Sequence, residues 1–180
     1  MNVQMKAAVL LCWSVLVLNA APGKGRVDRL SAVPYTEQGA GHGVSAAALV
    51  QSGSVLFVAG GCNFPETPAV DGGAKRYYSQ ILGWNGRSWW SAGRLRQPLA
   101  YGVAVPASDG FIYIGGQNAR GSQSSVDLYH MGAGALPVIE SLPSLPHPID
   151  NMAGVRAGSR VFVAGGLVAG QPSNALYCLD

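Results

Sequence analysis

Amide, phenol and guanidinium side chains stand where short apolar runs of this sequence give way to loops. Groups of these types bind small polar ligands, because amides and phenols donate and accept hydrogen bonds and an arginine fork can hold a carboxylate through two parallel bonds. Two of the arginines, Arg76 and Arg120, could also be ordinary surface ion-pair or capping residues. The sequence predicts a ligand site built from seven side chains: Asn63, Arg76, Tyr101, Gln117, Asn118, Arg120 and Asn151.

Two carboxylates, Glu66 and Asp71, lie in a long loop over residues 62–78. Loops of this length in compact domains are more often functional than idle, and a carboxylate in one can act as a general acid or base. A solvated surface carboxylate is the simpler interpretation of each. Lys75 and Asp150 occupy comparable loop positions. The catalytic residues therefore stay unassigned at the level of sequence.

Metal and disulfide chemistry have little support. His42, His130 and His147 stand alone, without the spacing of metal ligands, so we expect no metal. Cys62 and Cys178 are too far apart in sequence to define a disulfide framework, although a single bridge stays open. The formal net charge is +3 and the basic residues are scattered, which argues against a nucleic-acid partner or a polybasic membrane patch.

The first 21 residues have the pattern of a secretory signal peptide. Lys6 precedes an apolar run over residues 7–18, and small residues follow it. The run is shorter than the roughly 20 residues that a spanning helix needs, so an uncleaved anchor is a weaker alternative. A lipid-modified Cys12 is also weaker, because only a short apolar stretch precedes it and Leu11 is a poor match to the small residue expected there. We expect a periplasmic or secreted protein, with no stable membrane insertion after cleavage and a mature domain over residues 22–180.

An internal repeat organises the rest of the chain. Three β-rich apolar runs each end in a glycine pair, at residues 55–61, 111–116 and 161–166. The pairs are 55 and 50 residues apart, a period typical of kelch repeats. Two glycines at the end of a buried strand permit backbone conformations closed to other residues, and they let neighbouring blades approach closely.

Further strand-like runs flank each glycine pair, which gives four strands per repeat, the number in a propeller blade. We predict an all-β fold, a kelch-repeat β-propeller with about three four-stranded blades of a six-bladed ring, near residues 41–92, 100–142 and 151–180. Residues 27–34 are predicted to form the outer strand of a closing blade. Because open blade edges invite self-association, we expect the chain made alone to be a marginal fold and a poor catalyst.

Several segments of the repeat region resemble one enzyme family. They are residues 60–65 (GGCNFP), 72–81 (GGAKRYYSQI), 93–95, 100–102 and 114–116. Together they resemble the cyclically permuted mutarotase family, which is similar to the sialic acid mutarotases, or N-acetylneuraminate epimerases, of bacterial kelch type. The resemblance covers residues 27–180, about half of a family member. Cys62 stands where a smaller residue is expected, and Gln80 where an acidic residue is common.

The resemblance implies a sugar mutarotase that interconverts the anomers of N-acetylneuraminate without a cofactor, so that its partner is a small-molecule sugar. Opening and reclosing the hemiketal ring needs an acid and a base, and the sugar carboxylate needs a cation or amide donors. Propellers place such sites at one mouth of the central channel, where the seven side chains are expected to meet. A non-catalytic exported kelch module that binds carbohydrate or protein is the alternative, because a fold does not fix a function.

Overall fold

The computed structural model describes residues 27–132 and 136–180. The chain divides into two compact units, Met1–Ser31 and Ala32–Asp180. In the first unit the described residues have no regular secondary structure. The described part of the second unit is almost entirely β, with two short 3-10 helices, η1 (Ala40–His42) and η2 (Ala69–Asp71). The all-β class predicted from the sequence is confirmed.

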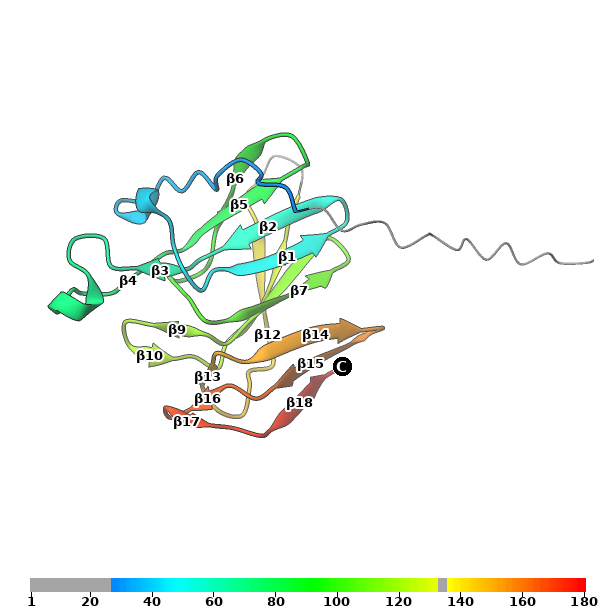
Figure 1. Cartoon of the computed structure of the whole chain (residues 1–180). Helices are drawn as coiled ribbons and strands as arrows, with labels where there is room; N and C mark the ends of the chain where they lie inside the picture. Colours follow the sequence, from blue (N-terminus) through cyan, green and yellow to red (C-terminus); the bar gives the residue numbers. More distant parts are fainter. Residues whose placement is uncertain (1–26, 133–135) are drawn as a thin grey trace, which may run out of the picture. The chain divides into compact units, whose positions relative to one another are not determined.

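Three antiparallel sheets follow one another along the second unit (Figure 1). The first has the order β1-β2-β5-β6, with β1 (Ala48–Ser52), β2 (Val55–Ala59), β5 (Gln80–Trp84) and β6 (Trp89–Arg94). The second has the order β7-β8-β11-β12, with β7 (Val103–Ala107), β8 (Gly110–Ile114), β11 (Val126–His130) and β12 (Val138–Leu142). The third has the order β14-β15-β18, with β14 (Ala153–Ala157), β15 (Arg160–Ala164) and β18 (Leu176–Leu179). Each sequence repeat therefore forms one sheet, the arrangement of propeller blades.

Shorter strands project from one end of these sheets, which we call the hairpin end (Figure 1). In the first repeat β3 (Cys62–Asn63) pairs with β4 (Arg76–Tyr77), and in the second β9 (Gln117–Asn118) pairs with β10 (Gly121–Ser122). In the third repeat three short strands pair in the order β13-β16-β17: β13 (Ile149–Asp150), β16 (Leu167–Val168) and β17 (Gln171–Pro172). All of the predicted ligand-binding positions fall on or next to these strands.

The sheets stack through their faces, with β1 beside β7 and β7 beside β14. Aromatic rings fill the space between the first two sheets: the Phe57 and Phe111 centroids are 5.6 Å apart, and the Phe111 and Tyr129 rings stack at 5.2 Å. Between the second and third sheets, Ile114 and Val163 belong to one fully buried cluster. Burial of apolar surface between successive sheets is thus the main stabilising contribution.

Gly60 shows how closely successive repeats approach. Its φ angle is 68°, and a Cβ atom at this position would lie 2.2 Å from the carbonyl oxygen of Leu99, which leads into the second sheet. The equivalent Gly115 has a φ angle of 55°, and its Cβ would lie 2.6 Å from the carbonyl oxygen of Ile149. Only glycine combines this conformation with this contact. The structure agrees with the role predicted for the glycine pairs.

Other predictions for the ends of the chain and for the cysteines have different outcomes. Residues 27–34 form no strand, because their apolar residues recur every three positions and a half-buried strand needs a period of two. The signal peptide predicted at residues 1–21 lies outside the described residues. Cys62 and Cys178 are both free thiols, so no bridge joins them. No helix in the described ranges is long and apolar enough to cross a membrane.

Candidate functional site

A run of backbone hydrogen bonds crosses the hairpin end from one repeat to the next. The Tyr101 N–H donates to the Ala46 carbonyl at 3.0 Å, and the Asn151 N–H donates to the Tyr101 carbonyl at 2.8 Å. All three residues have a positive φ angle, 54° for Ala46, 59° for Tyr101 and 56° for Asn151. They occupy the same position in successive repeats, which places their side chains at one end of the molecule.

Lys75 binds the second of these residues. Its Nζ donates a hydrogen bond to the Tyr101 hydroxyl at 3.0 Å and lies 4.9 Å from the centre of the Tyr101 ring. The same ammonium lies 5.6 Å from the centre of the Phe64 ring. The buried Cys62 thiol approaches the Tyr101 oxygen at 3.5 Å. The long loop of the first repeat is therefore attached to Tyr101 through a cation and two aromatic rings.

A second polar link joins the first two repeats beside this cluster. The Tyr77 hydroxyl donates to the Gln117 side-chain oxygen at 3.0 Å. The backbone of Gln117 is fixed by reciprocal hydrogen bonds with Ala100, at 2.7 and 2.9 Å. The hairpins of the two repeats are thus held in register at the point where the ligand-binding side chains were predicted.

A groove of about 420 Å³ opens between these hairpins, within the range of about 300–1,000 Å³ that small-molecule sites occupy. It is lined by Lys75, Arg76, Tyr77, Gln97, Pro98, Asn118, Ala119 and Arg120. Three of the lining residues are basic and none is acidic. The groove is therefore suited to an anionic ligand of small size.

The three cations of the groove differ in their partners. Arg76 forms an ion pair with Glu66 at 3.0 Å and donates to the Gln38 carbonyl. Arg120 is exposed, and its guanidinium has no hydrogen-bond or ion-pair partner among the described residues. Lys75 has no carboxylate partner there either. Arg120 and Lys75 are therefore the cations without a carboxylate partner in the described ranges, whereas Arg76 is paired with Glu66.

Two predicted amides support the loops. The Asn63 side chain donates to the carbonyls of Gly39 and Gly43, both at 2.8 Å, and accepts from the Tyr78 hydroxyl at 2.7 Å. The Asn118 side chain accepts from the backbone N–H of Arg120 at 2.8 Å and donates to Gln97 at 3.0 Å. Asn63 thus anchors the loop that carries Lys75, and Asn118 shapes the turn that carries Arg120.

In the third repeat, Asp150 is a buried carboxylate next to Asn151. One of its oxygens accepts from the Ser122 hydroxyl and the other accepts from the Asn151 amide. Asn151 itself is exposed, and Asp71 is an exposed residue of η2. Asp150 therefore ties the second repeat to the third rather than standing free in the groove.

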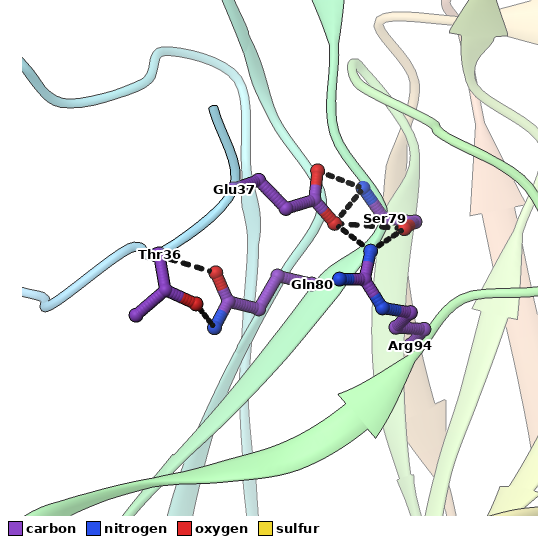
Figure 2. Close-up of polar contacts among 5 residues, drawn as sticks. All are labelled: Thr36, Glu37, Ser79, Gln80 and Arg94. Carbon is purple, nitrogen blue, oxygen red and sulfur yellow. Dashed lines mark hydrogen bonds and ion pairs between the residues drawn. The ribbon is translucent and has the colours of Figure 1, made fainter. Parts of the chain in front are cut away.

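A segment before the first sheet, residues 35–38, bonds to Arg76, Ser79 and Gln80, and we call it the strap. Figure 2 shows the Glu37 carboxylate directed at Ser79, where it accepts from the backbone N–H at 3.2 Å and from the hydroxyl at 2.9 Å. Arg94 donates to the same carboxylate at 2.5 Å. Ser79 closely follows Lys75 and Tyr77 in sequence. The strap therefore fixes the connection between β4, which carries Tyr77, and β5.

The second contact of the strap explains the glutamine at position 80. Its buried amide accepts from the Thr36 backbone N–H and donates to the Thr36 hydroxyl, both at 2.9 Å (Figure 2). A carboxylate could accept both hydrogens but would place a charge in a buried site, which costs free energy. The neutral amide satisfies both groups without that cost.

The cluster at Tyr101 changes the titration of its neighbours. The hydrogen bond from the Lys75 ammonium to Tyr101 raises the pKa of Lys75, against the smaller opposing effect of burial. Burial raises the pKa of the Tyr77 phenol, although the nearby Lys75 opposes it. At neutral pH the site therefore holds a protonated Lys75 beside a neutral Tyr77 phenol. No group of three or more His, Cys, Asp or Glu side chains in the described ranges could hold a metal ion.

The structure brings the seven predicted residues to one end of the sheets in three different roles. Arg76, Asn118 and Arg120 line the groove, and Tyr101 and Gln117 contact its lining residues Lys75 and Tyr77. The other two, Asn63 and Asn151, bind the supporting backbone and Asp150.

Sequence reasoning did not single out Tyr77 or Gln97, and it left Lys75 without a role. The repeat period relates Gln117 to Cys62, 55 residues earlier, but it gives no signal for Tyr77 or Gln97. Tyr77 lies on the returning strand of a loop whose length differs between repeats, so no period could locate it.

Comparison with known proteins shows a relationship over part of the chain. No family model matches the sequence. An N-acetylneuraminate epimerase of Salmonella arizonae is 37% identical over 95 residues, which are 47% of this chain and 25% of the relative. The protein of the same name from Brucella suis is 34% identical over 88 residues, 44% of this chain and 23% of the relative.

A solved structure, described as the structure of YjhT, matches with 27% identity and a TM-score of 0.48, over 54% of this chain and 31% of the other. The matched part corresponds to about a quarter of the length of the curated relatives. Over about half of its own length, this chain is homologous to N-acetylneuraminate epimerases.

Proposed function

We propose that this chain belongs to a sugar mutarotase that interconverts the anomers of N-acetylneuraminate, and that the groove at its hairpin end binds this sugar. The homology to N-acetylneuraminate epimerases supports the reaction class. The observation that carries the proposal is the cationic groove: a sugar acid needs a positive charge for its carboxylate, and the groove has three basic side chains and no acidic one.

Arg120 is the cation best suited to hold the sugar carboxylate. Its guanidinium has no partner within the described residues, so a ligand need not displace an existing ion pair. Arg76 is less available, because Glu66 and the Gln38 carbonyl already occupy its guanidinium. A bidentate bond from a guanidinium to a carboxylate also fixes the orientation of the sugar ring.

Exchange between the two anomers can be followed directly by NMR magnetisation transfer, with and without the purified chain. The proposal predicts faster exchange of N-acetylneuraminate when the chain is present. Arg120→Ala should reduce this acceleration by about tenfold, whereas Arg87→Ala, which removes an exposed arginine from the turn between β5 and β6, should leave it unchanged.

A neutral N-acetylated aldose provides a matched substrate. Because it has no carboxylate, Arg120→Ala should not change whatever exchange the chain supports for it. Ligand shifts with no acceleration by the wild-type chain would contradict a mutarotase and would support the non-catalytic carbohydrate-binding module.

A further inference from the structure

The hydroxyl of Tyr101 has an unusual set of partners, one of which, Lys75, lines the groove. Lys75 donates to it at 3.0 Å, and the Cys62 thiol approaches it at 3.5 Å. An ammonium group has no lone pair, so in the first contact the phenol oxygen must be the acceptor. The Tyr101 proton is therefore not used by Lys75 and is free to point to a third partner.

The backbone explains the position of this residue but not its type. Ala46 and Asn151, at the same point of the neighbouring repeats, share its left-handed conformation. Asparagine tolerates that conformation, whereas a bulky residue there is strained by about 1–2 kcal/mol. A tyrosine at position 101 is thus unfavourable for the fold, and what distinguishes it from its equivalents is a hydroxyl bonded to a cation.

We infer that Tyr101 is the proton donor to the ring oxygen of the sugar and that Lys75 is the residue that positions and polarises it. This inference rests on the proposed mutarotase function. The ammonium of Lys75 stabilises the negative charge that forms on the phenol oxygen when its proton leaves. The ammonium also lies within cation–π distance of the Phe64 and Tyr101 rings, which favours its position beside that oxygen.

The step balances in protons and electrons. As the bond between the anomeric carbon and the ring oxygen breaks, the Tyr101 hydroxyl gives its proton to the ring oxygen, and the proton of the anomeric hydroxyl passes to solvent water. The open form carries a ketone in place of the hemiketal. When the ring recloses, the sugar hydroxyl that was the ring oxygen attacks the other face of the carbonyl carbon. It returns its proton to Tyr101, while the carbonyl oxygen takes a proton from solvent.

The ionisable groups around Tyr101 come from four elements. They are Lys75 in the loop, Cys62 on β3, Tyr77 on β4 and, through its effect on Tyr77, Asp150 on β13. The pKa of Lys75 is raised by its bond to Tyr101, so the cation persists to higher pH than an isolated lysine would. Removing the Lys75 charge is therefore expected to change the alkaline limb of the pH profile of exchange.

Two variants at position 101 separate chemistry from folding. Tyr101→Phe keeps the ring and removes the hydroxyl, and Tyr101→Asn places there the residue that its equivalent, Asn151, already uses in the same conformation. Both should lower the protein-dependent exchange of N-acetylneuraminate by about tenfold or more. Their affinity for the sugar, measured by ligand-observed NMR titration, should stay within about threefold, because a general acid contributes to the transition state more than to binding. Tyr177→Phe, a change on β18, is the matched control and should behave as wild type.

Two variants at position 75 test the positioning role. Lys75→Arg keeps a cation and should retain most of the exchange, whereas Lys75→Met should lose about tenfold and alter the alkaline limb of the pH profile. A folding defect would appear in thermal unfolding, where Tyr101→Asn should be at least as stable as wild type.

The outcomes distinguish the two levels of the proposal. A wild-type chain that binds the sugar without accelerating exchange overturns the mutarotase function and this inference with it. An active wild-type chain whose Tyr101→Phe and Tyr101→Asn variants are folded and equally active overturns the inference alone.

Discussion

Asn151 donates its backbone N–H to the carbonyl of Tyr101 at 2.8 Å, and both residues hold a left-handed conformation. Tyr101 makes the same bond to Ala46 in the preceding repeat. A left-handed, non-glycine residue therefore stands before each of the three sheets, at Ala46, Tyr101 and Asn151, and orients a side chain at the hairpin end. This backbone feature places Tyr101 and Asn151 at equivalent points of successive repeats.

This feature predicts how substitutions at Asn151 affect stability. Both Asn151→Gly and Asn151→Ala lose the side-chain bond to Asp150, but only alanine is strained at a φ angle of 56°. The alanine variant should therefore be less stable than the glycine variant by about 1 kcal/mol, measured by urea unfolding. Equal stabilities would show that the backbone conformation at this position is not the constraint.

The contact between repeats at Gly60 can be separated from its conformation. Gly60→Ala adds a Cβ atom 2.2 Å from the Leu99 carbonyl oxygen, whereas Gly53, with a φ angle of 57°, has open space around its Cβ position. We expect Gly53→Ala to cost about 1 kcal/mol and Gly60→Ala to cost about 2–3 kcal/mol or more. Similar unfolding midpoints for the two variants would contradict the close approach.

The strap provides a test of which partner of Glu37 matters. Arg94 is 64% exposed and Glu37 only 14%, so the ion pair is screened on the arginine side. Arg94→Ala should cost no more than about 0.5–1 kcal/mol. Glu37→Ala leaves the backbone N–H and hydroxyl of Ser79 without their acceptor and should cost about 1–3 kcal/mol. Chemical denaturation of both variants measures the difference, and an equal loss would assign the stabilisation to the ion pair.

At the opposite end of the second sheet, His130 lies between two carboxylates. Its ring nitrogens contact Asp109 at 2.8 Å and Glu140 at 3.4 Å. The bond to Asp109, and then that to Glu140, raises the pKa of His130 above its ordinary value of 6.5. A raised pKa in the folded state contributes stability that is fully present below the ordinary value and is lost as pH rises through the folded value.

An NMR titration of the His130 ring protons tests this assignment. Asp109→Asn should lower the pKa of His130 toward its ordinary value, and Glu140→Gln should lower it less, because Asp109 forms the shorter contact. A larger change from Glu140→Gln would reverse the assignment. Because His130 lies away from the hairpin end, neither variant should change sugar binding.

Export is the prediction that depends on residues 1–21. Lys6 and the apolar run at 7–18 should direct the chain to a secretion pathway, with cleavage near residue 21. Intact-mass measurement of protein recovered from the periplasm or the medium should show an N-terminus at about that residue. An exported protein that still starts at Met1 would contradict a cleaved signal peptide.

The strands could be predicted from the sequence because pairs of glycines mark the ends of three of them. Glycine pairs at a regular spacing predicted the three sheets. The prediction of an outer strand at residues 27–34 was wrong. A strand needs a partner strand and an apolar period of two, and the sequence there shows neither.

The candidate site was predicted less completely, for a physical reason. Its residues meet through tertiary contacts of a loop that differs in length from its equivalents, so the bond between Lys75 and Tyr101 has no signature in the local sequence. Arg120, whose guanidinium has no partner among the described residues, and Arg76, whose guanidinium is paired, cannot be told apart by residue type. Only the positions of Glu66 and the strap distinguish them.

The measurement that tests the central claim most directly is the exchange rate between the anomers of N-acetylneuraminate, by NMR magnetisation transfer, with wild-type chain and with Arg120→Ala. The account predicts that the wild-type chain accelerates exchange above the buffer rate and that Arg120→Ala loses about tenfold of that increment. An exchange rate equal to that of buffer alone, from a folded wild-type chain with saturating sugar, would contradict it.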